Sequence, residues 1–100
     1  TPTSVGQTGT VQPGQFTLAQ NYPNPFNPST TIEYSLDRSG IVTLKIYNIL
    51  GQEVATLVNG FQNAGSSRAV FNASGLSSGI YLYRLQSEKL SQTQKMILMK

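Results

Sequence analysis

Few side chains in this sequence could perform chemistry. The chain contains no His and no Cys, so it lacks the usual general base, the commonest transition-metal ligand and every thiolate. Its carboxylates are Glu33, Asp37, Glu53 and Glu88, and none is spaced to converge on a metal ion or to flank a scissile bond. Ser and Thr are frequent, but none has a nearby base that could activate its hydroxyl. We therefore expect neither an enzyme nor a metal or cofactor site.

The charged residues are few and unevenly placed. Lys and Arg number 7 against 4 Asp and Glu, which gives a net charge of +3. The excess lies in the last quarter of the chain, where Arg84, Lys89, Lys95 and Lys100 accompany a single acid, Glu88. Because only 11% of the residues are charged, no face can carry the dense basic stripe that nucleic acids require. We expect no nucleic-acid partner, and we expect any protein partner to read the C-terminal end.

The elements that must position these groups are β-strands. Apolar residues recur with the period of strands, and no segment has a helical period. Strands are expected at 16–20, 31–36, 41–48, 53–58, 67–72, 80–86 and 92–99. In the second strand, Ile32, Tyr34 and Leu36 alternate with polar residues and should face the core. Short strands with turn signals about every 8–12 residues predict one seven-stranded, antiparallel, immunoglobulin-like β-sandwich.

Turn residues separate these strands. Residues 37–40 form a turn, and Gly51 reverses the chain between the third and fourth strands because glycine tolerates positive φ. Residues 59–65 are expected to form a longer loop. The strand at 67–72 leaves two registers open, in which the inward pair is either Ala69 and Phe71 or Arg68 and Val70.

A tyrosine corner is expected before the strand at 80–86. Immunoglobulin-like sandwiches often enter this strand with a Tyr whose hydroxyl bonds backbone upstream. Leu76, Gly79 and Tyr81 supply an apolar plug, a bend and that tyrosine. The alternation that follows directs Tyr83 and Leu85 inward and Arg84 outward.

A proline-rich strap precedes the second strand. Pro23, Pro25 and Pro28 forbid a helix and regular sheet pairing, and Tyr22 and Phe26 can pin the segment to the sandwich. The strap is either a structural cover over one sheet edge or a rigid recognition surface.

The N-terminal residues have the composition of a linker. Residues 1–15 are polar and rich in Gly, Ser, Thr and Pro, which predicts a flexible linker ahead of a domain at 16–100. The start has no Met, basic region or apolar stretch typical of a signal peptide, and no apolar run approaches the roughly 20 residues that cross a membrane. We therefore expect a piece of a longer protein whose export signal lies upstream, with no membrane insertion.

Four segments together carry a resemblance to a known family. They are residues 21–28 (NYPNPFNP), 46–54 (IYNILGQEV), 79–85 (GIYLYRL) and 95–100 (KMILMK). With these motifs in this order, residues 16–100 resemble the type A C-terminal sorting domain of type IX secretion, which is similar to the immunoglobulin-like module of flagellar hook-capping proteins. The sequence departs from the family at Glu88-Lys89, where many members have a Gly-containing turn.

The resemblance implies a role in protein export in Bacteroidota and related phyla. An N-terminal cargo domain would reach the periplasm with a signal peptide, and the outer-membrane components of type IX secretion would then recognise the C-terminal domain. A sortase-like peptidase would cut in or near residues 1–15, and the cargo would be released or attached to surface lipopolysaccharide. The recognition residues that the resemblance implies are Gly79, Tyr81, Arg84, Lys95 and Lys100. The strand at 92–99 could offer an edge to be paired or gripped.

Two other functions remain open. The chain could be a structural immunoglobulin-like spacer or assembly module of a multidomain extracellular protein. It could also be a carbohydrate-binding accessory module, which should expose two or three coplanar aromatic side chains.

Overall fold

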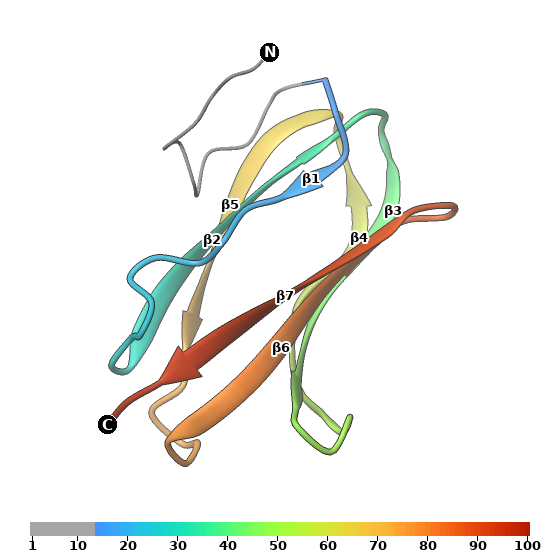
Figure 1. The fold of residues 1–100 in the computed structure, drawn as a ribbon. Coiled ribbons are helices and arrows are strands. Elements are labelled where there is room, and N and C mark those ends of the chain that lie inside the picture. Colours follow the sequence, from blue (N-terminus) through green and yellow to red (C-terminus); the bar gives the residue numbers. More distant parts are fainter. Residues whose placement is uncertain (1–13) are drawn as a thin grey trace.

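The computed structural model describes residues 14–100, so nearly all of the expected linker at 1–15, with its cleavage site, lies outside the described residues. Within 14–100 the elements are all strands: β1 Thr17–Leu18, β2 Ser29–Leu36, β3 Gly40–Asn48, β4 Glu53–Gln62, β5 Gly65–Asn72, β6 Gly79–Gln86 and β7 Ser91–Leu98. They form a sheet ordered β1-β2-β5 and a sheet ordered β4-β3-β6-β7, which face each other (Figure 1). Every strand pairing is antiparallel. The predicted seven-stranded β-sandwich is confirmed.

The core lies between the two sheets and follows the period-two alternation of the strands. From β2 it receives Ile32, Tyr34 and Leu36, all buried, as the sequence predicts. The other sheet contributes buried alternate residues of β3, β6 and β7, namely Val42, Leu44, Ile46, Tyr81, Tyr83, Leu85, Met96 and Leu98. Fully burying one such aliphatic side chain contributes roughly 1.5–3 kcal/mol, so these rows hold the sheets together. Among residues 14–100, no helix is long and apolar enough to span a membrane.

The hairpin between β3 and β4 turns where the sequence predicts. Gly51 has φ +84°, and its N–H donates to the carbonyl oxygen of Asn48 over 3.0 Å. The Asn48 side chain closes the turn further, because its Oδ1 accepts from the N–H groups of Leu50 and Gln52 at 2.9 and 3.0 Å. The turn geometry is therefore supplied by Asn48 and Gly51.

β4 runs to Gln62 rather than ending at 58. Gly60 pairs with Val42, and Gln62 pairs with Gly40, so residues 59–62 remain in the ladder of β3. Gly60 has φ +155°, an uncommon conformation for other residues, so this glycine belongs to an irregular strand and does not mark a turn. The prediction of a loop over 59–65 is wrong in this part.

The register left open for β5 is settled by burial. Phe71 is buried and Ala69 packs against the core, whereas Val70 is 65% exposed on the outer face. Arg68 also points outward, opposite Glu33 of β2, with 3.5 Å between its Nη2 and Glu33 Oε2. The pair at 69 and 71 is therefore the inward one.

Candidate functional site

The predicted tyrosine corner is present where the chain enters β6. Tyr81 is buried, and its hydroxyl donates to the carbonyl oxygen of Ser77 over 2.7 Å. Gly79 has φ +153° at the start of the strand, and Leu76 packs against the core. Gly79 and Tyr81 therefore shape the corner, and the Tyr81 ring faces the interior.

Lys100 is held against the same corner. Its backbone N–H donates to Ser78 Oγ over 3.0 Å, and its Nζ donates to the carbonyl oxygen of Ser74 over 2.6 Å. Three of the five expected recognition residues, Gly79, Tyr81 and Lys100, thus lie together at the β5–β6 connection. Figure 1 shows this connection, the C-terminal residue and the β3–β4 hairpin at one end of the sandwich.

The strap covers the outer edge of β7. Phe26 donates its N–H to the carbonyl oxygen of Ile97 over 3.0 Å and accepts from the N–H of Met99 over 2.9 Å. Asn24 Oδ1 accepts from the N–H of Ile97 over 3.0 Å. Phe26 itself is only 1% exposed, and its ring centroid lies 6.2 Å from that of Phe71. The interpretation of the strap as an edge cover is supported, and residues 97–99 do not offer a free edge for pairing.

Two side chains of β7 also bind the backbone at β1, so the contacts along this edge continue beyond the strap. Gln92 Nε2 donates to the carbonyl oxygen of Phe16 over 3.0 Å, and Gln92 Oε1 accepts from the N–H of Leu18 over 3.0 Å. Gln94 Nε2 donates to the carbonyl oxygen of Leu18 over 3.0 Å. These glutamines are not among the residues that the sequence motifs indicate. Their parity with buried Met96 and Leu98 was the available signal, because a polar side chain on an inward-facing row needs a partner.

Tyr83 of β6 binds the backbone of residues 19–21, which lie between β1 and the strap. Its buried hydroxyl donates to the carbonyl oxygen of Ala19 and accepts from the N–H of Asn21, both over 2.7 Å. Asn21 in turn donates its side-chain amide to Thr30 Oγ1 over 2.9 Å. The N-terminal segment from Phe16 to Phe26 is thus joined to β6 and β7 through backbone and side-chain contacts.

Burial of Tyr34 and Tyr83 makes the stability of the fold depend on pH. Desolvation raises the pKa of the Tyr83 phenol above its ordinary value, opposed by the weaker effect of the hydrogen bond from Asn21, and desolvation likewise raises the pKa of Tyr34. In the unfolded chain these phenols ionise near pH 10. Their contribution to stability is therefore fully present below about pH 10 and is lost as the pH rises above it.

We expect unfolding of this chain to become easier above about pH 10. The denaturant concentration at the midpoint of unfolding, followed by circular dichroism at about pH 9 and about pH 11, should fall with pH. A Tyr83→Phe variant should show a shallower decline, because it lacks one of the ionising groups. Equal declines in the two proteins would contradict the assignment.

Two of the expected recognition residues project from the outer face of the four-stranded sheet. The guanidinium carbon of Arg84 lies 5.3 Å from the centroid of the Tyr47 ring, a cation–π arrangement. Lys95 is exposed on β7 and lies opposite Leu82 of β6. Within residues 14–100 the ion pairs join other residues, so Arg84 and Lys95 are cations without an acidic partner.

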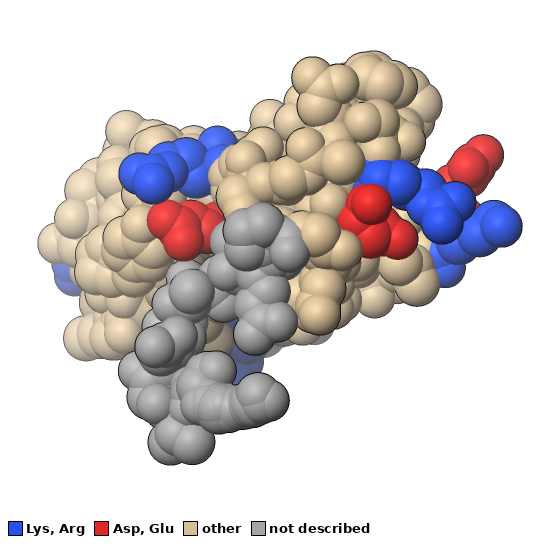
Figure 2. Space-filling view, turned by 90° about the horizontal axis from the view of Figure 1, so that it is seen from above, with Lys and Arg blue, Asp and Glu red and all other residues tan. Residues whose placement is uncertain are grey.

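Glu33 and Glu53 bind neighbouring polar and basic side chains at the surface. Glu33 accepts from the Tyr22 hydroxyl over 2.8 Å and lies beside Arg68, and Glu53 lies 3.3 Å from Lys45 Nζ. Hydrogen bonds from Thr56 and Lys45 hold the pKa of Glu53 below its ordinary value. In the view of Figure 2 the basic side chains form small separate groups, several with an acidic side chain beside them. Among residues 14–100, no cluster of His, Cys, Asp or Glu could hold a metal ion.

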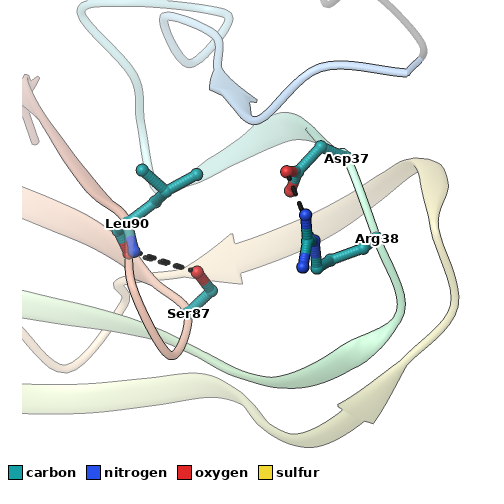
Figure 3. A network of polar contacts seen from close by, with 4 residues as sticks. All are labelled: Asp37, Arg38, Ser87 and Leu90. Atoms are coloured by element: carbon teal, nitrogen blue, oxygen red, sulfur yellow. Dashed lines mark hydrogen bonds and ion pairs between the residues drawn. The ribbon is translucent and has the colours of Figure 1, made fainter.

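A cleft of about 260 Å³ lies at the opposite end of the sandwich from the corner. It lies between the 37–40 turn and the 87–90 turn, and its apolar lining includes Phe16, Leu36 and Val42. Figure 3 shows the two turns, with Asp37 beside Arg38 at 3.7 Å and the N–H of Leu90 donating to Ser87 Oγ at 3.2 Å. The bond between Leu90 and Ser87 closes the β6–β7 hairpin, although Glu88 and Lys89 stand where many sorting domains have a Gly-containing turn. The lining contains no His or Cys, so it offers no nucleophile–base pair of the usual kind.

The exposed aromatic rings do not form a sugar-binding platform. Among the described residues, the strongly exposed ones are Tyr22, at 44%, and Phe61, at 62%. Tyr22 bridges to Thr31 of β2, whereas Phe61 pairs with Ile41 in the other sheet. A carbohydrate module needs its aromatics together on one surface, so this alternative gains no support.

Comparison with known families decides the class. A family model described as the secretion system C-terminal sorting domain matches residues 20–99. The chain belongs to this family. The matched range begins within the segment before the strap and ends one residue short of Lys100, so it spans β2 to β7. No curated protein matches the chain.

Membership of this family indicates the role of the chain. The sorting domain is a C-terminal signal for type IX secretion, as the four sequence motifs imply. Such a signal works together with an N-terminal cargo and interacts with the type IX machinery, and it implies a protein that is secreted or attached to the cell surface. The family is one of non-catalytic secretion signals. The roles of the individual recognition residues stay predictions.

Proposed function

We propose that this sorting domain is a non-catalytic, folded tag that outer-membrane components of type IX secretion recognise on cargo arriving from the periplasm. A sortase-like peptidase then cuts in or near residues 1–15, and the cargo is released or attached to surface lipopolysaccharide. Among the described residues, the contacts with β7 begin at Phe16, which agrees with a cut ahead of that residue. This proposal fits a domain whose described carboxylates are spread over the surface and do not converge on one site.

The covered edge of β7 is the observation that carries the proposal of a folded tag. β7 pairs with β6 along its length, and its outer backbone groups near the end are bonded to the strap. A partner that added a strand there would first have to displace Phe26, which is buried. We therefore assign recognition to side chains on the folded surface. Arg84 and Lys95 can contact a partner directly, while Gly79, Tyr81 and Lys100 maintain the corner.

A reporter fusion tests this function. Residues 1–100 are placed after a fluorescent protein that carries an export signal, in a host with type IX secretion. We expect fluorescence at the cell surface or in the medium only when the domain is present, and periplasmic retention in a matched strain without the translocon. Exported reporter should have lost most of the 10.8-kDa tag. Retention of the complete fusion in the periplasm of the competent host would refute the proposal and favour a structural spacer.

A further inference from the structure

The outer face of the four-stranded sheet combines half-buried and exposed apolar side chains with basic side chains that have no acidic partner within residues 14–100. The strand register places Tyr47, Leu82 and Lys95 in one row across β3, β6 and β7. The row on one side holds Lys45, Arg84 and Thr93, and the row on the other holds Ile80 and Ile97. We call the set Tyr47, Ile80, Leu82, Arg84, Lys95 and Ile97 the docking face. The core rows alternate with these positions, so packing between the sheets does not require their side chains.

The apolar part of the docking face continues onto the β3–β4 hairpin. Ile80 is 44% exposed, and Ile49 and Leu50 at the hairpin tip are 71% and 78% exposed. Asn48 pairs with Tyr81, so the tip begins beside the Ile80 end of β6. Because Asn48 and Gly51 supply the turn geometry, folding does not demand large aliphatic residues at the tip. Clustered exposed apolar residues of this kind mark interaction surfaces.

The charge of the docking face differs from that of the opposite outer face. On the three-stranded sheet, Arg68 is offset by Glu33 at 3.5 Å. On the four-stranded sheet, Glu53 offsets Lys45, but Arg84 and Lys95 lack an acidic partner within residues 14–100. Stacking on Tyr47 also restricts the Arg84 side chain, which lowers the entropy lost when it binds. The face is therefore complementary to carboxylates placed around an apolar centre.

We propose that the docking face binds a protein of the type IX machinery through a surface on which acidic side chains surround an apolar patch. The proposal rests on the proposed function, in which the folded domain is recognised. An anionic membrane fits less well, because membrane-surface binding generally uses clusters of about 4–8 basic residues. Leu82 lies at the centre of the face, between Tyr47 and Lys95, and Arg84 and Lys95 supply its charge.

The test uses the reporter fusion with Leu82→Glu and, as a matched control, Val70→Glu. Val70 occupies an outward strand position on the opposite sheet and is 65% exposed. A carboxylate at the centre of the docking face should lower export about tenfold, the effect of losing a moderate interface contact, and the control should stay within about twofold of the unchanged fusion. Circular dichroism melting of the purified fusions verifies that both variants fold.

A second variant decides the outcome if Leu82→Glu does not fold. Arg84→Glu combined with Lys95→Glu changes only exposed side chains and should also lower export about tenfold, whereas Arg68→Glu should not. A photo-crosslinking amino acid at position 82 should form an adduct with an outer-membrane component of the machinery, and the double variant should abolish it.

Three results would overturn the inference, and each is separable from failure of the proposed function. Export of the unchanged fusion with no difference between the docking-face and control variants would leave the function standing and remove this face. Normal export of the folded Arg84→Glu, Lys95→Glu variant would also show that this face is not needed for recognition. Binding of the unchanged fusion to vesicles of anionic phospholipid, lost in the double variant while the adduct at position 82 is absent, would assign the face to a membrane instead. Periplasmic retention of the unchanged fusion, by contrast, would refute the proposed function itself.

Discussion

Replacing Phe26 by alanine is expected to lower the free energy of unfolding by about 3–5 kcal/mol. Phe26 is 1% exposed, and its ring packs against Phe71 in the core. Its backbone also donates to Ile97 and accepts from Met99, so the cavity would weaken the attachment of the strap to β7. Such a loss is a large part of the roughly 5–15 kcal/mol that stabilises a typical domain. Chemical denaturation of the 100-residue chain, followed by circular dichroism, measures it.

Tyr22→Ala is the matched control for this prediction. Tyr22 belongs to the same strap but is 44% exposed, and its hydroxyl contacts Glu33 at the surface. We expect this substitution to cost no more than about 1 kcal/mol. Phe26→Ala should in addition expose the edge of β7 and favour association of chains, which size-exclusion chromatography detects. Equal losses of stability in the two variants would show that the strap does not depend on its buried anchor.

The sequence predicts the fold well where alternation is regular. Ile32, Tyr34 and Leu36 follow a strict period of two between polar residues, and all three are buried as expected. The corner is equally predictable, because Tyr81 and Gly79 have their expected spacing and the hydroxyl reaches Ser77. These features depend on local patterns, which one sequence carries completely.

The sequence predicts less where distant segments decide the structure. Gly60 reads as a turn residue, yet pairing with Val42 keeps it within a strand. Gln92 contacts Phe16 and Leu18, which lie more than 70 positions away in the chain. No periodicity in either segment encodes that contact, since it depends on which strands become the neighbouring edges of the two sheets.

In the candidate site, too, local patterns predict the direction of a side chain but not its distant neighbours. The outward direction of Arg84 follows from its parity with Tyr83 and Leu85, and the structure confirms it. The Tyr47 ring beneath Arg84 could not be predicted, because it requires that β3 and β6 be neighbours in a particular register. Lys95 and Lys100 look equivalent in the sequence and are both exposed, but the Lys100 ammonium donates to the Ser74 carbonyl oxygen at the corner, whereas Lys95 lies on β7.

Tyr83→Phe is expected to lower the free energy of unfolding by about 2–6 kcal/mol, although it removes a single oxygen atom. The Tyr83 hydroxyl is the partner of both the Ala19 carbonyl and the Asn21 N–H, at 2.7 Å each. Both residues are buried, so the substitution leaves one acceptor and one donor without a partner away from water. Each such group costs about 1–3 kcal/mol.

Tyr81→Phe separates this effect from the general loss of a tyrosine hydroxyl. The Tyr81 hydroxyl makes one hydrogen bond, to Ser77, whose carbonyl lies in an exposed loop where water can replace the lost donor. We therefore expect a smaller cost, about 1 kcal/mol. Hydrogen exchange provides the residue-level readout: the amide of Asn21 should exchange much faster in Tyr83→Phe but not in Tyr81→Phe, because only Tyr83 accepts from it. Unchanged protection of Asn21 in Tyr83→Phe would mean that the strap is held by Phe26 and the β7 contacts alone.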